Sequence, residues 1–309
     1  MTRQSRDNDL IETACRHMMG EFGLENMEPS FGMDPLALQR AHDAIHEFVF
    51  LAPLLSPPAT EARAKWDWQT KSAFLVYHTE VFNHAHRSLC EALCAYYNVA
   101  FVLLRVTCEL LIKGTFCECM SHKSYRENSS KLYNSKGKLK KWLEQVFKRS
   151  PNVEAQLEQT SATIYDIISP RMTCRDFLPS MRTMVRQLAE WDMFDPVPNA
   201  ATLVYEEIYG RLSADVHVVP GRTDIGRRIT TKDPDIFGQK VLPEVLSEYA
   251  ASLHTLMDLA IVIELNVMKS LVDEHEESRD NLRKRLDTLT SLGLRYGAER
   301  AEQLVESAT

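Results

Sequence analysis

The chain has 309 residues and 44% of them are hydrophobic, which supplies enough apolar side chains for a sizeable core. Its formal net charge of -7 excludes a protein that coats nucleic acid through an overall basic surface, although it leaves room for a local basic site. The seven cysteines show no paired spacing, and the first residues lack the apolar run of a signal peptide. We therefore expect a soluble, cytoplasmic protein with free thiols, no cofactor and no membrane association.

The first half of the chain contains two segments whose apolar residues recur at helical spacing. The segment 35–52 begins with a proline, which is tolerated in the first turn of a helix, and the prolines of SPP at 56–58 end it. The segment 71–120 is predicted to form one helix, or two helices in line. Between Tyr96 and Phe116 its apolar residues lie almost all the way round, which predicts a central, buried helix.

The second half of the chain continues in helices that are separated by polar or proline-containing segments. Asn199 is a suitable N-cap for a helix that ends in RLSADVH, Arg211 to His217. Pro220 disfavours helical geometry in the residue before it, so this helix must end at about residue 218. Other helices are predicted at about 139–149, 152–168, 176–191 and 241–273, with charged helix in the last 35 residues.

Glycine is scarce, and the alternation of apolar and polar residues that marks a strand is hard to find. The predicted fold class is therefore all-α, a helical bundle with extra helices at both ends. We divide the chain into an N-terminal helical arm (1–60), the bundle (61–275) and a charged helical extension (276–309).

A stripe of charged residues crosses the predicted central helix. Arg105, Glu109 and Lys113 follow one another at intervals of four and therefore share one side of that helix. Buried charges are costly unless they are paired, so the stripe is either a self-satisfied ion ladder, a solvent-facing stripe, or the wall of a polar cleft.

The motif RLSADVH is the second candidate site. Arg211 and His217 lie six positions apart, about 120° around an ideal helix, so they act together only if the last turn loosens or a second subunit contributes its own pair. A helix C-terminus favours a protonated histidine. The loop after the motif carries three more arginines, which form a cationic rim. An arginine and a histidine beside such a rim, with no obvious metal ligands, suit the binding and cleavage of a phosphodiester. The alternative is that His217 only caps its helix. The arginines of the rim are Arg222, Arg227 and Arg228.

A zinc site is a weaker alternative. His86, Cys90 and Cys94 are spaced by four along one predicted helix, and His84 is nearby. Zinc prefers these ligand types, but structural sites usually take paired ligands from two separated places. Three ligands on one helix would need a second helix to complete the site.

These segments together resemble the HEPN superfamily of helical proteins. The resemblance rests on LLRVTCELLIKGTF, with an R-x-x-x-E helix, on IYGRLSADVHVVPG, and on the long final core helix. It covers roughly residues 70–275. It implies a HEPN-like bundle that forms a homodimer in which two Arg–His motifs face one cleft.

In active family members that cleft is a metal-independent endoribonuclease site of toxin–antitoxin or phage-defence systems. By resemblance, Arg211 and His217 are the catalytic pair, with RNA as substrate and an antitoxin or defence-system protein as a possible partner. Where active members commonly carry a polar residue after the arginine, this chain has Leu212, so a non-catalytic module that binds a protein or nucleic-acid partner is the alternative. The supporting polar residues would be Arg105, Glu109, Ser213 and Asp215, and the RNA-binding residues Arg222, Arg227 and Arg228.

Overall fold

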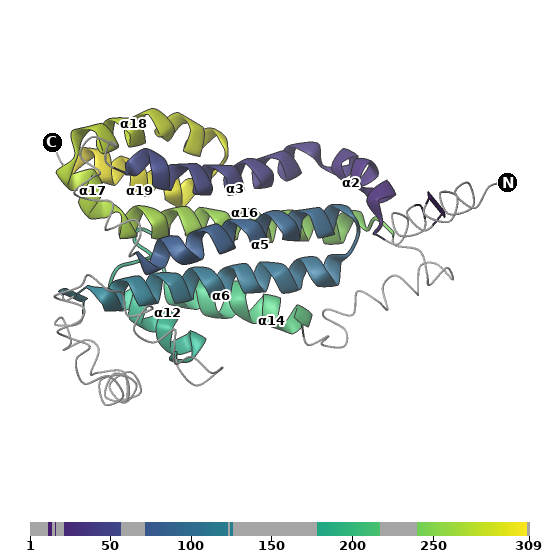
Figure 1. Cartoon of the computed structure of the whole chain (residues 1–309), viewed down its shortest axis with the longest axis horizontal. Coiled ribbons are helices and arrows are strands. Elements are labelled where there is room, and N and C mark those ends of the chain that lie inside the picture. Colours follow the sequence, from purple (N-terminus) through teal and green to yellow (C-terminus); the bar gives the residue numbers. More distant parts are fainter. Residues whose placement is uncertain are drawn as a thin grey trace, which may run out of the picture.

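The structure is a computed structural model, and its described part contains helices and no strand. The predicted all-α class is therefore confirmed. Figure 1 shows long helices stacked in layers, with α18 and α3 on one side, α5 and α16 in the middle, and α6, α12 and α14 on the other side. The described residues are 12, 13, 16, 22–56, 72–122, 124–125, 178–216 and 240–307.

Helix α3 (Pro35–Leu55) follows the short elements η1 (Leu24–Asn26) and α2 (Met27–Met33). It begins where the sequence predicts, because Pro35 occupies the first turn and the Asp34 side chain accepts a hydrogen bond from the backbone N–H of Ala37 at 3.2 Å. One face of α3 is buried against the bundle. The fully buried residues of this face include Leu38, Ala41, Ile45, Phe48, Leu51 and Leu55.

The predicted 71–120 segment forms a helical hairpin, α5 (Ala73–Leu93) and α6 (Tyr97–Ser121). The prediction of one helix or two in line was therefore wrong. The chain reverses at 94–96, where Ala95 adopts a left-handed φ of 66°. At the open end of the hairpin Glu118, near the end of α6, accepts hydrogen bonds from Ser72 Oγ at 2.9 Å and the Phe74 N–H at 3.0 Å.

Helix α16 (Pro243–Val267) is the second core helix and packs against α3, α5 and α6. By length and composition alone it could cross a membrane, but 72% of its most apolar window is buried inside the bundle, as expected of a core helix. The Tyr249 hydroxyl lies 2.6 Å from Ser88 Oγ on α5, which joins the two helices in the core. The predicted 241–273 helix breaks at Met268, after which α17 (Lys269–Glu274) continues.

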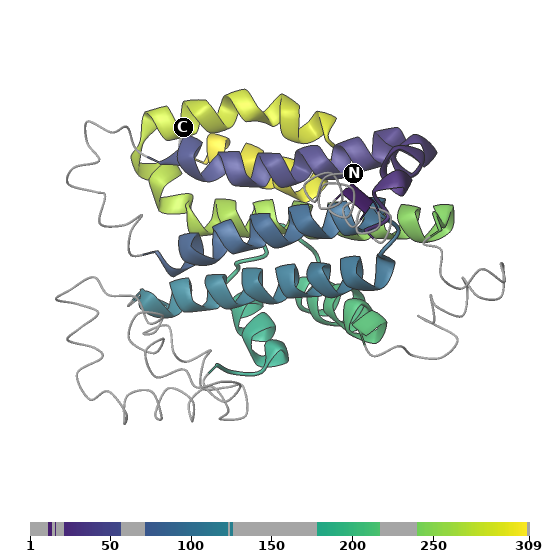
Figure 2. The ribbon, with the colours of Figure 1, turned by 45° about the vertical axis from the view of Figure 1, so that its right-hand side comes forward.

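The last two helices pack onto the same core as α3. Helix α18 (Glu276–Ser291) lies against α3, and Ser278 Oγ donates to the Leu55 carbonyl at 2.9 Å. Helix α19 (Arg295–Glu306) lies against α16, where the Asp258 carboxylate accepts from the Gly297 N–H at 2.8 Å. Figure 2 shows α18 beyond α3 and α19 level with α3, both on the side of α16 that faces away from α6.

Shorter helices cover the other side of α6. They are α12 (Met181–Glu190), α13 (Ala200–Thr202), the π-helix η3 (Leu203–Tyr209) and α14 (Gly210–Val216). The predicted helix does begin after Asn199, but that residue adopts a left-handed φ of 51° and its side chain makes no capping hydrogen bond. The predicted helices at 139–149 and 152–168 lie outside the described residues.

The described cysteines are free thiols, as expected. Cys108 and Cys117 are fully buried on α6, and burial raises the pKa of each thiol to about 12. A buried thiol with so high a pKa is a packing residue and a poor nucleophile. Cys90, Cys94 and Cys119 are the other described cysteines.

Candidate functional site at the end of helix α14

The helix that carries RLSADVH is irregular where it crosses α6. It begins as α13, widens into the π-helix η3 and tightens again as α14. π-Helical turns are rare and are often found at functional sites. The irregular stretch, together with the part of α6 beneath it, is therefore the first candidate for a site.

Glu109 is the centre of a polar network between α6 and η3. Its Oε1 lies 3.1 Å from Arg105 Nε, and its Oε2 accepts from Lys113 Nζ at 3.2 Å. The Tyr209 hydroxyl donates to the same Oε1 at 3.3 Å and accepts from Arg105 Nη2 at 3.1 Å. The predicted stripe is thus an internally paired ion ladder on a part-buried face, and it is extended by a tyrosine from the motif-bearing helix.

Two tyrosines of η3 lie between an arginine of α12 and an arginine of α6, and we call this series the Arg–Tyr strip (Arg182, Tyr205, Tyr209 and Arg105). The rings of Tyr205 and Tyr209 are nearly parallel, with centroids 5.8 Å apart and an interplanar angle of 24°. The guanidinium of Arg182 lies 5.7 Å from the Tyr205 ring centroid, and that of Arg105 lies 5.2 Å from the Tyr209 centroid. Both distances fall within the range of a cation–π interaction.

Arg211 lies on the side of α14 that faces α16. Its guanidinium donates a hydrogen bond to the Glu248 carboxylate, and its side chain remains 53% exposed. Because the pair is solvent-exposed, it contributes little to stability and can open when an anion competes for the arginine. A cavity of about 190 Å³ lies beside this pair. Its lining consists of Leu203, Glu207, Ile208, Arg211, Leu212, Ala251, Ser252 and Thr255.

Leu212 and the remaining predicted site residues fall into three groups. Leu212 is buried and Ser213 is half-buried, so both point into the fold rather than to open solvent. Asp215 belongs to α14, of which only the backbone is described at that position. The other predicted residues lie outside the described part of the chain: His217, Arg222, Arg227 and Arg228.

The structure thus joins Arg105 and Glu109 to Tyr209, and it joins Arg211 to Glu248 on another helix. Sequence reasoning missed Tyr205 and Tyr209. Their spacing of four within one predicted helix was the signal that they share a face.

The hypothetical zinc ligands on α5 do not come together. His84 Nδ1 lies 2.8 Å from the carbonyl oxygen of Glu80 on its own helix, whereas His86 lies among two histidines of α3. Cys90 and Cys94 are not part of that histidine group.

The chain was also compared with known proteins. Comparisons of the chain with protein-family models, with curated proteins and with solved structures gave no match.

Proposed function

We propose that this protein binds single-stranded RNA along the Arg–Tyr strip and cleaves it without a metal, with Arg211 and His217 as the reacting pair. The observation that carries the proposal is the strip itself, which ends next to the helix that bears Arg211. The resemblance of RLSADVH to the HEPN motif supports the same assignment.

The strip has the chemistry of a platform for unpaired bases. Single-stranded nucleic acid is commonly held by aromatic rings on which bases stack and by cations that follow the backbone, and each stacked base contributes about 1 to 3 kcal/mol. Tyr205 and Tyr209 are half-buried, so each keeps part of its ring accessible. Arg182 is exposed at one end of the strip, where it can contact a phosphate.

The cleavage step needs one group to take a proton and one to return it. The RNA 2′-hydroxyl loses its proton to a histidine and attacks phosphorus, the bond to the 5′-oxygen breaks, and that oxygen takes a proton from a second acid. The products are a 2′,3′-cyclic phosphate and a 5′-hydroxyl. Arg211 stabilises the charge on the phosphoryl oxygens. A homodimer would supply the second histidine, since each chain carries one motif.

The test is cleavage of a single-stranded RNA in excess EDTA. Wild type should release fragments with 2′,3′-cyclic phosphate ends, while His217→Ala and Arg211→Ala should each lose activity by about 100-fold or more. Arg87→Ala is the matched control, because Arg87 is also an exposed arginine paired with a glutamate, on α5. Equal cleavage by wild type and His217→Ala, or activity that disappears in EDTA, would overturn the ribonuclease proposal.

A non-catalytic binding module is the second candidate. It is favoured by two observations, the burial of Leu212 and the engagement of Arg211 by Glu248. This function predicts that wild type binds RNA without cleaving it, and that Arg182→Ala weakens binding while His217→Ala does not.

A further inference from the structure

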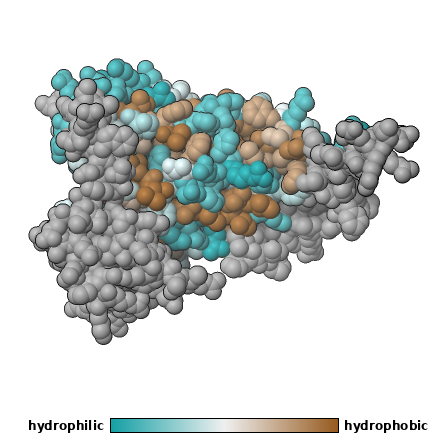
Figure 3. Space-filling view, viewed as in Figure 1, coloured by the Kyte–Doolittle hydropathy of each residue, from teal (hydrophilic) through white to brown (hydrophobic). Residues whose placement is uncertain are grey.

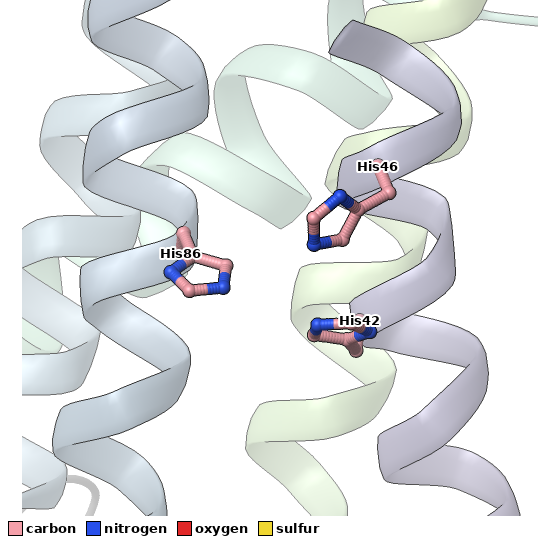
Figure 4. Close-up of side chains that lie close together, drawn as sticks. All are labelled: His42, His46 and His86. Atoms are coloured by element: carbon pink, nitrogen blue, oxygen red, sulfur yellow. The ribbon is translucent and has the colours of Figure 1, made fainter. Parts of the chain in front are cut away.

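Three histidines from two helices converge on one side of the bundle. His42 and His46 lie one turn apart on α3, and His86 faces them from α5. One potential ligand atom from each imidazole lies within 4.8 Å of the other two. Figure 4 shows the three rings directed toward the space between the two helices.

Phenylalanines frame this histidine cluster. Phe82 stacks on His86 and meets the edge of His46, with both ring centroids 5.8 Å away. Phe50 also lies on α3, and its ring centroid is 6.1 Å from the ring centroid of His46. All three histidines are half-buried, so the cluster has an apolar surround and one side open to solvent.

We propose that His42, His46 and His86 bind one late first-row divalent metal ion, with Zn²⁺ as the expected occupant. Neutral imidazole is a preferred ligand of zinc, copper and nickel ions, and three imidazoles leave one position for water or another small ligand. With Zn–N bonds of about 2.1 Å, ligand nitrogens of a tetrahedral ion lie about 3.4 Å apart. The three ligand atoms lie within 4.8 Å of one another, so they would have to move closer to reach that separation.

The carboxylate of Asp43 orients the His42 side chain. Asp43 Oδ1 lies 3.1 Å from His42 Nδ1, and Gln39 Nε2 donates to the same oxygen at 2.7 Å. A hydrogen bond from Nδ1–H to a carboxylate leaves Nε2 of His42 as the free ligand atom and fixes the orientation of the ring.

The histidine cluster is separate from the Arg–Tyr strip. It lies between α3 and α5, whereas the strip lies on the opposite side of the α5–α6 hairpin, along α6 and η3 (Figure 1). A bound ion would join α3 to the hairpin. The inference therefore goes beyond the proposed RNA chemistry and does not depend on it.

The experiment titrates the metal-free protein with Zn²⁺ by calorimetry and with Co²⁺ by visible absorption. We expect one ion per chain, the absorption bands of a nitrogen-ligated Co²⁺, and a rise in Tm when Zn²⁺ is added. His86→Gln and the double variant His42→Ala/His46→Ala should lose more than about 100-fold in affinity. Asp43→Asn should lose about 10-fold to 100-fold, because it removes only the orienting carboxylate.

His84→Ala is the matched control, since His84 is a partly exposed histidine on α5 that is not part of the cluster. It should bind Zn²⁺ as wild type does. The Tm of each variant without metal shows whether it is folded. A wild type that binds no Zn²⁺, or a loss of binding in His84→Ala equal to that in His86→Gln, would mean that the cluster serves only packing.

Discussion

The Tyr209 hydroxyl joins two charged groups of α6, because it donates to Glu109 Oε1 at 3.3 Å and accepts from Arg105 Nη2 at 3.1 Å. One hundred residues separate Tyr209 from Glu109 along the chain. This contact fixes the motif-bearing helix against the central helix, and it gives Tyr209 two separable roles, one for the hydroxyl and one for the ring.

Substitutions at Tyr209 should separate those roles. Tyr209→Phe removes both part-buried hydrogen bonds of the hydroxyl and should lower the free energy of unfolding by about 1 to 3 kcal/mol, while RNA affinity is kept because the ring remains. Tyr209→Ala removes the ring as well and should weaken RNA binding by about tenfold. Urea unfolding and fluorescence anisotropy with a labelled RNA measure the two effects. An equal loss of affinity in both variants would show that the hydroxyl, and not the ring, is what RNA binding requires.

The second prediction concerns the close packing of α5 against α6. A Cβ atom at Gly114 would lie 2.7 Å from Tyr77 Cβ, which is closer than two carbons can approach. Gly114→Ala must push the helices apart and should lower the free energy of unfolding by about 1 to 3 kcal/mol.

Gly32→Ala is the control for that prediction. Gly32 lies in α2, and a Cβ atom added there would have no heavy atom within 4 Å, so alanine should raise the free energy of unfolding by about 0.5 to 1 kcal/mol. Both values come from urea unfolding curves. A stabilising Gly114→Ala would contradict the close approach of the two helices.

The third prediction concerns the buried pair His78 and Glu264, whose Nε2 and Oε1 atoms lie 3.3 Å apart. Burial disfavours the protonated form of His78, but the Glu264 carboxylate and the Phe48 carbonyl, which lies 3.2 Å from Nε2, outweigh burial, so the pKa of His78 is raised above its ordinary 6.5. The folded state therefore holds this proton more tightly than the unfolded state. The stabilisation is complete below about pH 6.5 and is lost as the pH rises through the folded-state pKa.

Glu264→Gln should flatten this dependence, because it removes the carboxylate that raises the pKa of His78. The measurement is the free energy of unfolding at about pH 6 and about pH 8, in wild type and variant. His84→Gln, on the same helix as His78, should keep the wild-type dependence. His46 has a lowered pKa and acts in the opposite sense as the pH falls through about 6.5, but its contribution is the same in wild type and variant and cancels when the two are compared. The same pH dependence in wild type and in Glu264→Gln would contradict the pairing.

Exposed apolar residues remain on the folded surface. Figure 3 shows separate hydrophobic patches among hydrophilic ones on the face seen in Figure 1. The exposed large apolar residues of α6 are Val99 and Val102, and α3 contributes Leu36 and Phe50.

The sequence by itself determined the all-α class and where several helices begin and end. Helical periodicity marked the buried faces of α3, α6 and α16, and Pro35 marked the start of α3. These features are local, since they depend on residues within a few turns of one another. That is why the helix at 35–52 could be predicted to within a few residues.

Only the tertiary structure decided which helices meet. It reversed the chain at Ala95, joined Tyr209 to Glu109, and placed His86 beside His42 and His46 instead of Cys90. Periodicity shows that one face of a helix is buried, but it does not show which residues cover that face. The covering side chains come from segments that are distant in the sequence, and their packing depends on the whole fold.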